Sequence, residues 1–86
     1  MSYRVVLPKS VQKELDRLPD KEAGVILERI KTLEQNPRPN NCLKLAGHDN
    51  EYRIRIGDYR AIYQILENEK VVVLLHCRHR KDVYRQ

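Results

Sequence analysis

Arginine side chains in the C-terminal part of this sequence have the types and spacing best suited to chemistry. Arg53, Arg55 and Arg60 lie within residues 52–63, where basic and apolar residues alternate with the two-residue period of a β-strand. Their guanidinium groups are planar and permanently charged, and they form paired hydrogen bonds with phosphate oxygens. We therefore expect this cluster to hold an anion.

The same spacing predicts a β-hairpin. Gly57 and Asp58 form a two-residue loop with Gly at its first central position, as a type II′ turn requires. This loop length predicts four cross-strand pairs: Ile56 with Tyr59, Arg55 with Arg60, Ile54 with Ala61, and Tyr52 with Tyr63. Like charges directly opposite each other destabilise a sheet, so the paired arginines indicate a bound anion. A solvated sheet face without a ligand is the alternative.

The tail of the chain supplies further candidate groups. Its basic and aromatic side chains can extend the cluster: Arg78, His79, Arg80, Lys81, Tyr84 and Arg85. Because His76 and His79 are separated by an odd number of residues, only one of them can face the arginines. A two- or four-residue turn within 67–70 predicts that His79 does so, together with Cys77, whereas a three-residue turn predicts His76.

The sequence lacks the motifs of several common kinds of catalytic and metal-binding site. It has no Gly-rich phosphate loop, no Ser-His-Asp pattern and no evident carboxylate pair. Cys42 and Cys77 are isolated thiols without the paired ligand spacing of a zinc module, so neither a disulfide framework, a metal nor a cofactor is expected. Catalysis would then rest on cationic groups that hold a phosphate and on a nucleophile that the substrate brings. An RNA 2′-hydroxyl attacking its own phosphate fits this requirement.

Composition predicts one soluble domain spanning 1–86. The chain has 86 residues, 41% of them hydrophobic and 34% charged, and it shows no signal peptide and no apolar run near the length of a membrane span. We therefore expect a cytoplasmic protein without a membrane partner. Residues 52–86 carry eight basic and four acidic side chains and four of the five tyrosines. A basic surface with aromatic side chains indicates nucleic acid as the partner.

The pattern along the chain predicts an α+β fold with two helices covering one face of an antiparallel meander. A strand at 2–7 ends at Pro8, and two helices follow, with apolar stripes at Val11, Leu15 and Leu18 and at Ala23, Ile26, Leu27, Ile30 and Leu33. Asp20 is the expected N-cap of the second helix, and Asn36-Pro37 ends it. A connector at 37–51 precedes strands in 52–56, 59–66 and 71–75, and the tail from His76 leaves the sheet and closes with one helical turn. The arginine face of the sheet is left open.

The chain resembles the RelE/ParE superfamily of bacterial toxin–antitoxin systems, and within it the RelE-like branch. The resemblance covers nearly the whole chain, including the opening strand and the helical hairpin. It rests on four segments: Asn36-Pro37-Arg38, Leu43-Lys44-Leu45-Ala46-Gly47, the hairpin at 52–63, and His79-Arg80-Lys81-Asp82-Val83-Tyr84.

The resemblance implies a RelE-like order of elements, β-α-α-β-β-β with a short closing helix. It also implies an endoribonuclease that cuts messenger RNA in the ribosomal A site and leaves a 2′,3′-cyclic phosphate. The implied partners are a cognate antitoxin, which wraps the toxin with an amphipathic helix or adds a strand, and the ribosome with its mRNA.

The resemblance assigns the family's site positions to particular residues of this chain. Arg53 and Arg55 stand where a well-known branch of the family has two lysines, Arg60 matches its post-turn arginine, and Tyr84 matches its late tyrosine. The remaining tail arginine is Arg78 or Arg80, depending on whether the ending is aligned without a gap.

We slightly favour Arg80 over Arg78 for this position. Arginine cannot accept a proton, so His79 or Tyr84 is the candidate for proton transfer. Two other functions stay open: a ParE-like inhibitor of DNA gyrase without nuclease activity, and an RNA-binding module without catalysis.

Overall fold

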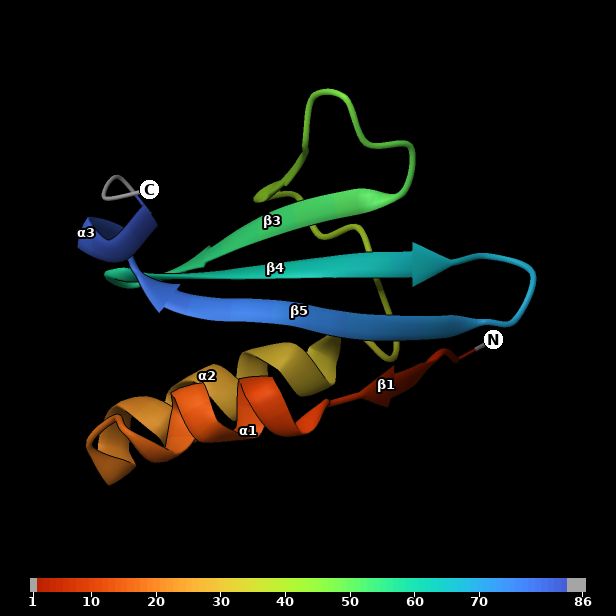
Figure 1. The fold of residues 1–86 in the computed structure, drawn as a ribbon. Helices are drawn as coiled ribbons and strands as arrows, with labels where there is room; N and C mark the ends of the chain where they lie inside the picture. The colour runs from red at the N-terminus through yellow and green to blue at the C-terminus, as the bar shows by residue number, and fades with distance from the viewer. Residues whose placement is uncertain (1, 84–86) are drawn as a thin grey trace.

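A two-helix layer lies on one side of a five-stranded sheet (Figure 1). The computed structural model describes residues 2–83, with side chains up to Lys81. The elements are β1 (Arg4–Val6), α1 (Lys9–Asp16), α2 (Asp20–Thr32), β2 (Cys42–Lys44), β3 (Glu51–Ile56), β4 (Tyr59–Leu66), β5 (Val71–His79) and α3 (Arg80–Val83). No helix in this described part of the chain is long and apolar enough to cross a membrane.

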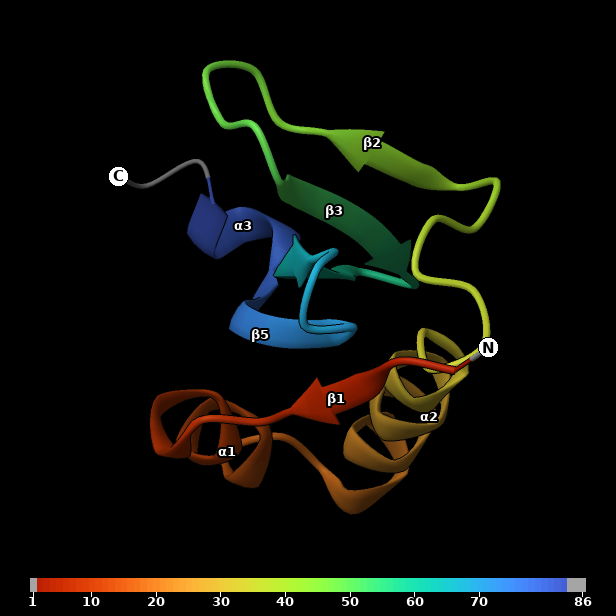
Figure 2. The ribbon, with the colours of Figure 1, turned by 90° about the vertical axis from the view of Figure 1, so that its right-hand side faces the viewer.

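The sheet has the strand order β1-β5-β4-β3-β2. The predicted α+β class is confirmed, and β3, β4 and β5 form the predicted antiparallel meander. The sheet is nevertheless mixed, because β1 pairs in parallel with Val71–Val73 of β5 while β2 pairs antiparallel with β3 at the other edge. β5 extends to His79, beyond the point where the tail was expected to leave the sheet. The basic tail therefore continues the sheet before α3 begins (Figure 2).

The predicted hairpin register is confirmed. Arg55 pairs with Arg60, Ile54 with Ala61, and Ile56 with Tyr59, as the two-residue loop requires. Gly57 has a φ of 60°, which an L side chain rarely adopts, while Asp58 keeps a negative φ as a type II′ turn demands.

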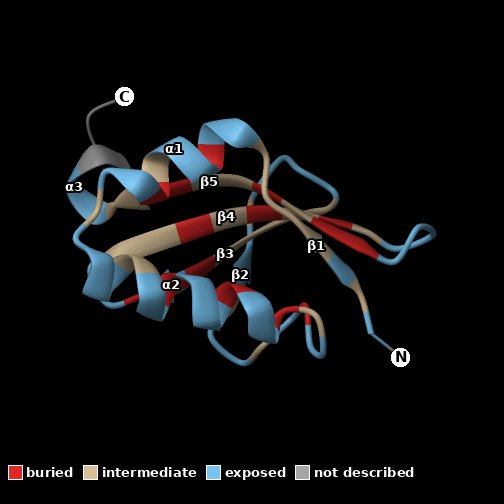
Figure 3. Ribbon diagram, turned by 90° about the horizontal axis from the view of Figure 1, so that it is seen from below, coloured by how far each residue is buried: buried red, intermediate tan, exposed pale blue. Residues whose placement is uncertain are grey.

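A single apolar core lies between the helices and the sheet (Figure 3). The helices contribute Val11, Leu15, Ile26 and Ile30, and Leu33 adds to them directly after α2. The sheet contributes Ile54, Ile56, Ala61, Tyr63, Ile65, Val72, Leu74 and Cys77. Leu27, which was expected in the buried stripe of α2, is 40% exposed. It follows Ile26 by about 100° around the helix and so turns away from the sheet. The expected N-cap was one residue late, since Pro19 precedes the first turn of α2.

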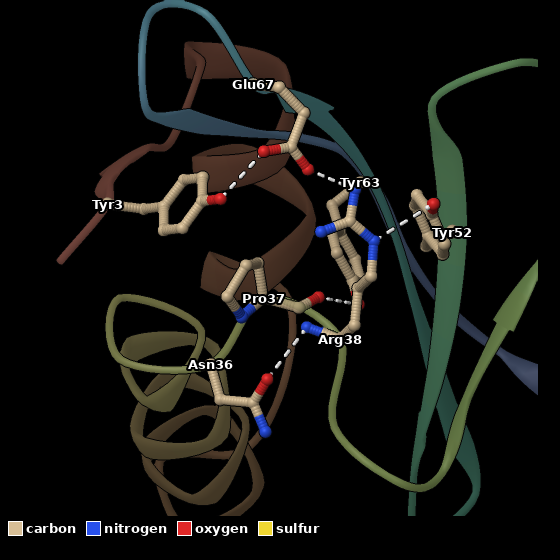
Figure 4. Close-up of polar contacts among 7 residues, drawn as sticks. All are labelled: Tyr3, Asn36, Pro37, Arg38, Tyr52, Tyr63 and Glu67. Atoms are coloured by element: carbon tan, nitrogen blue, oxygen red, sulfur yellow. Dashed lines mark hydrogen bonds and ion pairs between the residues drawn. The ribbon is translucent and has the colours of Figure 1, made fainter. Parts of the chain in front are cut away.

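Arg38 ties the connector between α2 and β2 to β3 and to the β4–β5 turn (Figure 4). Its Nε donates to the Tyr52 hydroxyl of β3 at 3.1 Å, and its Nη2 forms an ion pair with Glu67 in the β4–β5 turn. The other carboxylate oxygen of Glu67 accepts a hydrogen bond from the Tyr3 hydroxyl at 2.8 Å. These two partners hold the pKa of Glu67 below its usual value, Arg38 having the larger effect. The contacts fix the path of the chain toward residues 40–43.

Candidate functional site

One row of arginines crosses the three meander strands. The Cα partners are Arg55 on β3, Arg60 on β4 and Arg78 on β5. Cross-strand partners direct their side chains to the same face, so this row starts on the face opposite the core. Arg53 lies one row further along and shares this face with His76, through their common partner Ile62.

A pocket of about 250 Å³ lies over this face and is lined by Arg55, Arg60, Arg80 and Lys81. We call it the arginine pocket. Arg80 stands at the start of α3, where its backbone N–H donates to the Asp58 carbonyl oxygen at 2.7 Å. This bond ties the end of β5 to the hairpin turn and brings the Arg80 side chain beside the other two guanidinium groups. The pocket therefore combines four cationic side chains from β3, β4 and α3.

A second hollow of about 330 Å³ shares two arginines with this pocket. It is lined by Arg53, Arg55 and Arg60, by Asn40 and Asn41 of the connector, and by Cys42 and Leu43 of β2. We call it the asparagine groove. Asn41 donates from Nδ2 to the Arg55 carbonyl oxygen at 3.4 Å, which holds the connector against β3. Because the two hollows share Arg55 and Arg60, they lie next to each other on this surface.

The two alternative tail arginines have different environments. Arg80 lines the arginine pocket and is half exposed, with its Nε 3.9 Å from a carboxylate oxygen of Asp58. Arg78 instead directs its Nε to Glu14 on α1 at 3.2 Å. The geometry thus favours Arg80 as the tail arginine of the pocket.

His79 does not share the arginine face, so that prediction was wrong. The turn after Leu66 has four residues, but a β-bulge at Leu75 adds one residue to β5, since Tyr63 pairs with Leu74 and Ile62 with His76. The extra residue reverses which alternate side chains face the arginines.

The His79 ring lies on the core side of the sheet. It packs edge-on against Tyr59 with centroids 5.2 Å apart, and its Nδ1 accepts the backbone N–H of Lys81 at 3.2 Å. A proton-transfer role for His79 in the arginine pocket has no support in this arrangement. Tyr84, the other candidate, lies outside the described residues.

No three His, Cys, Asp or Glu side chains within residues 2–81 gather in a way that could hold a metal ion. Cys77 is 4% exposed, and burial, followed by the nearby charge of Glu14, raises the pKa of its thiol to about 11. This thiol is therefore protonated at neutral pH and serves as a small apolar side chain in the core.

Sequence reasoning missed several residues at this surface. Asn40 and Asn41 were treated as part of a connector, and Glu14 was not singled out. The Asn pair between two turn signals could have indicated a polar loop. Nothing local could have found Glu14, because its contact with Arg78 spans 64 positions of the sequence.

Comparisons with known proteins agree on one family. Residues 5–84 match the family described as "ParE toxin of type II toxin-antitoxin system, parDE". A RelE1 protein of Methanocaldococcus jannaschii is 32% identical over 88 residues, which cover 99% of this chain and 98% of that protein. Toxin RelG of Mycobacterium tuberculosis is 31% identical over 90 residues, with complete coverage of both chains.

A solved structure extends this agreement to the fold. A chain of the archaeal RelE-RelB complex from Pyrococcus horikoshii OT3 is 38% identical, with a TM-score of 0.83, and the match covers 93% of this chain and 97% of that chain. The chain therefore belongs to the RelE/ParE superfamily and is a RelE-like toxin of a type II toxin–antitoxin system.

Proposed function

We propose that this toxin is a ribosome-dependent endoribonuclease that cleaves mRNA in the A site and thereby inhibits translation. The observation that carries the proposal is the arginine pocket, in which Arg55, Arg60, Arg80 and Lys81 converge on one open hollow. The adjacent asparagine groove, which shares Arg55 and Arg60 with the pocket, suits a strand of RNA whose successive phosphates contact both hollows. Such a protein acts in the cytoplasm, where translating ribosomes are found.

The proposed reaction is a transesterification within the RNA. The ribose 2′-hydroxyl gives up its proton as its oxygen attacks the adjacent phosphorus. The bond from phosphorus to the 5′-oxygen breaks and that oxygen takes up a proton, so the products are a 2′,3′-cyclic phosphate and a 5′-hydroxyl end. Negative charge develops on the phosphate oxygens during this step, and the guanidinium groups of Arg55, Arg60 and Arg80 stabilise it. Arg53 holds a neighbouring phosphate and so aligns the attacking 2′-oxygen.

Proton transfer falls to a side chain other than arginine. A guanidinium group cannot accept a proton at physiological pH. With the His79 ring on the core side of the sheet, we assign this step to Tyr84. Replacement of Tyr84 by phenylalanine should lower the cleavage rate and leave mRNA binding in place.

The arginine pocket is tested by mapping mRNA 3′ ends after incubation of purified toxin with programmed ribosomes. Arg60→Ala and Arg80→Ala should each lower the cleavage rate by about 10²–10³-fold, the loss typical of removing one group that stabilises transition-state charge. Arg29→Ala is the matched control, because it removes the same charge from the exposed face of α2. Intact message with wild-type toxin, or equal losses in all three variants, would contradict the assignment.

A ParE-like gyrase inhibitor is the second candidate, because the matching family is described by its ParE toxin. A supercoiling assay with the same protein samples separates the two. Loss of gyrase activity with intact mRNA supports inhibition, whereas binding of RNA with neither effect supports a module without catalysis.

We also propose a cognate antitoxin, since the Pyrococcus relative was solved as a RelE-RelB complex. β2 forms an outer edge of the sheet and carries Leu43, which is 54% exposed. An antitoxin that adds a strand here, or lays an amphipathic helix nearby, would cover the wall of the asparagine groove.

A further inference from the structure

Arg78 belongs to the arginine row by its backbone but not by its side-chain contact. As the Cα partner of Arg60 it lies about 5 Å from that residue, and its side chain starts on the same face. Its guanidinium group nevertheless extends to the edge of β5, where Nε lies 3.2 Å from Oε2 of Glu14. A cation that could reach the arginine pocket is therefore engaged elsewhere.

Glu14 reaches this edge because of the order of the first elements. β1 covers only Val71–Val73 of β5, and α1 then runs beside the remainder of that strand (Figure 1). The Oε1 atom of Glu14 accepts the backbone N–H of Cys77 at 2.9 Å, which satisfies an amide on the exposed edge of the sheet. The same carboxylate lies 3.9 Å from Nδ1 of His76.

This contact removes one member from a row of like charges. With Arg78 bound to Glu14, its guanidinium group is not added to those of Arg55, Arg60 and Arg80 in the arginine pocket. The ion pair is itself partly exposed, with 28% of the Arg78 side chain and 23% of the Glu14 side chain accessible, so it is weak enough to exchange. A phosphate in the arginine pocket carries the same charge as the carboxylate and offers Arg78 an equivalent partner.

We propose that Glu14 is a positioning residue of the RNA site. It holds Arg78 at the edge of β5 in the free toxin, and an RNA phosphate in the arginine pocket competes with Glu14 for this guanidinium group. The proposal rests on the proposed function, because it takes the arginine pocket to be where RNA phosphates bind. It assigns Arg80 to the pocket at all times and Arg78 to the pocket only when RNA is present.

The test measures binding of a 2′-O-methyl oligoribonucleotide, which cannot be cleaved, as a function of salt concentration. Glu14→Gln keeps an amide oxygen for the Cys77 N–H but loses the charge that holds Arg78. We expect this variant to bind about two- to fivefold more tightly at low salt, the range that corresponds to a partly exposed ion pair. In the wild type, RNA binding leaves the Glu14 carboxylate without Arg78, whereas Glu14→Gln has no carboxylate to leave. The salt dependence of log Kd should therefore be steeper in the variant, by up to about 0.7 for each additional counterion released.

Two further variants separate positioning from a change in net charge. Asp16→Asn removes the same charge from an exposed position of α1 and should leave both quantities close to those of the wild type. Arg78→Ala should abolish the gain when it is combined with Glu14→Gln. Equal effects of Glu14→Gln and Asp16→Asn, or a gain that persists without Arg78, would overturn the proposal.

The wild-type protein provides a second measurement that does not depend on how the variants fold. The ¹⁵Nε–H signal of Arg78, identified by its loss in Arg78→Lys, should shift when the oligonucleotide is added. A stationary Arg78 signal at saturating RNA, with shifting signals from Arg55 and Arg60, would refute the exchange while leaving the proposed function intact. Absence of RNA binding by the wild type would instead refute the RNA site itself and the exchange with it.

Discussion

The hydroxyl of Tyr63 illustrates how one buried polar atom fixes the connector beside the site. Tyr63 is fully buried in β4, and its hydroxyl donates to the carbonyl oxygen of the buried Pro37 at 2.7 Å. Tyr63→Phe leaves that carbonyl without its donor in a place that water does not reach. We expect a loss of about 1–3 kcal/mol in the free energy of unfolding, measured by urea denaturation. Tyr52→Phe is the control, because its hydroxyl bonds with the exposed Arg38 and should cost less.

The pH dependence tests whether the Tyr63 hydroxyl is buried in its neutral form. Burial, followed by the nearby Cys42 thiol, raises the pKa of Tyr63 well above its ordinary value. A raised folded-state pKa gives stability that is present below the unfolded pKa of about 10 and is lost above it. The advantage of the wild type over Tyr63→Phe should therefore shrink as pH rises above about 10. A difference that stays constant up to pH 11 would contradict burial of the neutral hydroxyl.

At the scale of elements, the β3–β4 turn decides which arginines face each other. Gly57 has a φ of 60°, and a Cβ built there would meet no atom within 4 Å, so the cost of Gly57→Ala is conformational. We expect this variant to lose about 1 kcal/mol or more in unfolding free energy. Gly24→Ala is the opposite control, since the same substitution in the open middle of α2 should stabilise by about 0.5–1 kcal/mol. If Gly57→Ala raised the unfolding free energy, as Gly24→Ala is expected to, the turn would not need a residue with a positive φ at this position.

The same hairpin shows what the sequence could predict. Its register follows from the loop length and from alternation over a few residues, both of which are local, and the structure has each pair that was expected. The bulge at Leu75 is different in kind. No turn residue in the sequence marks its position. That single residue decided which of His76 and His79 faces the arginines.

Contacts between residues far apart in the sequence could not be predicted from local patterns either. The parallel contact of β1 with β5 joins residues more than sixty positions apart, and so does the hydrogen bond of Glu14 with Arg78. Arg53, Arg55 and Arg60 could be chosen from their spacing, whereas the choice of Arg80 for the arginine pocket required the bond from its N–H to Asp58. The local part of the candidate site was thus predictable, and its long-range part was not.

At the scale of the whole molecule, the fold separates the charges in space as well as in sequence. Most of the net charge of +5 comes from residues 52–86, which carry eight basic and four acidic side chains. Helices α1 and α2 cover one side of the sheet, and the arginine row begins on the other (Figure 1). A polyanion should therefore approach the open side first, and its affinity should depend on which cations are removed as well as on how many.

This separation predicts unequal salt effects from equal charge changes. For the 2′-O-methyl oligoribonucleotide, Arg55→Ala and Arg60→Ala should each make the salt dependence of log Kd less steep by about 0.7, because each variant releases one counterion fewer. Arg29→Ala lowers the net charge by the same amount from the helical side and should leave the slope almost unchanged. Titrations from low to moderate salt measure all three slopes under identical conditions. Three equal slopes would mean that RNA responds only to the overall charge, and the arginine pocket would then not be where its phosphates bind.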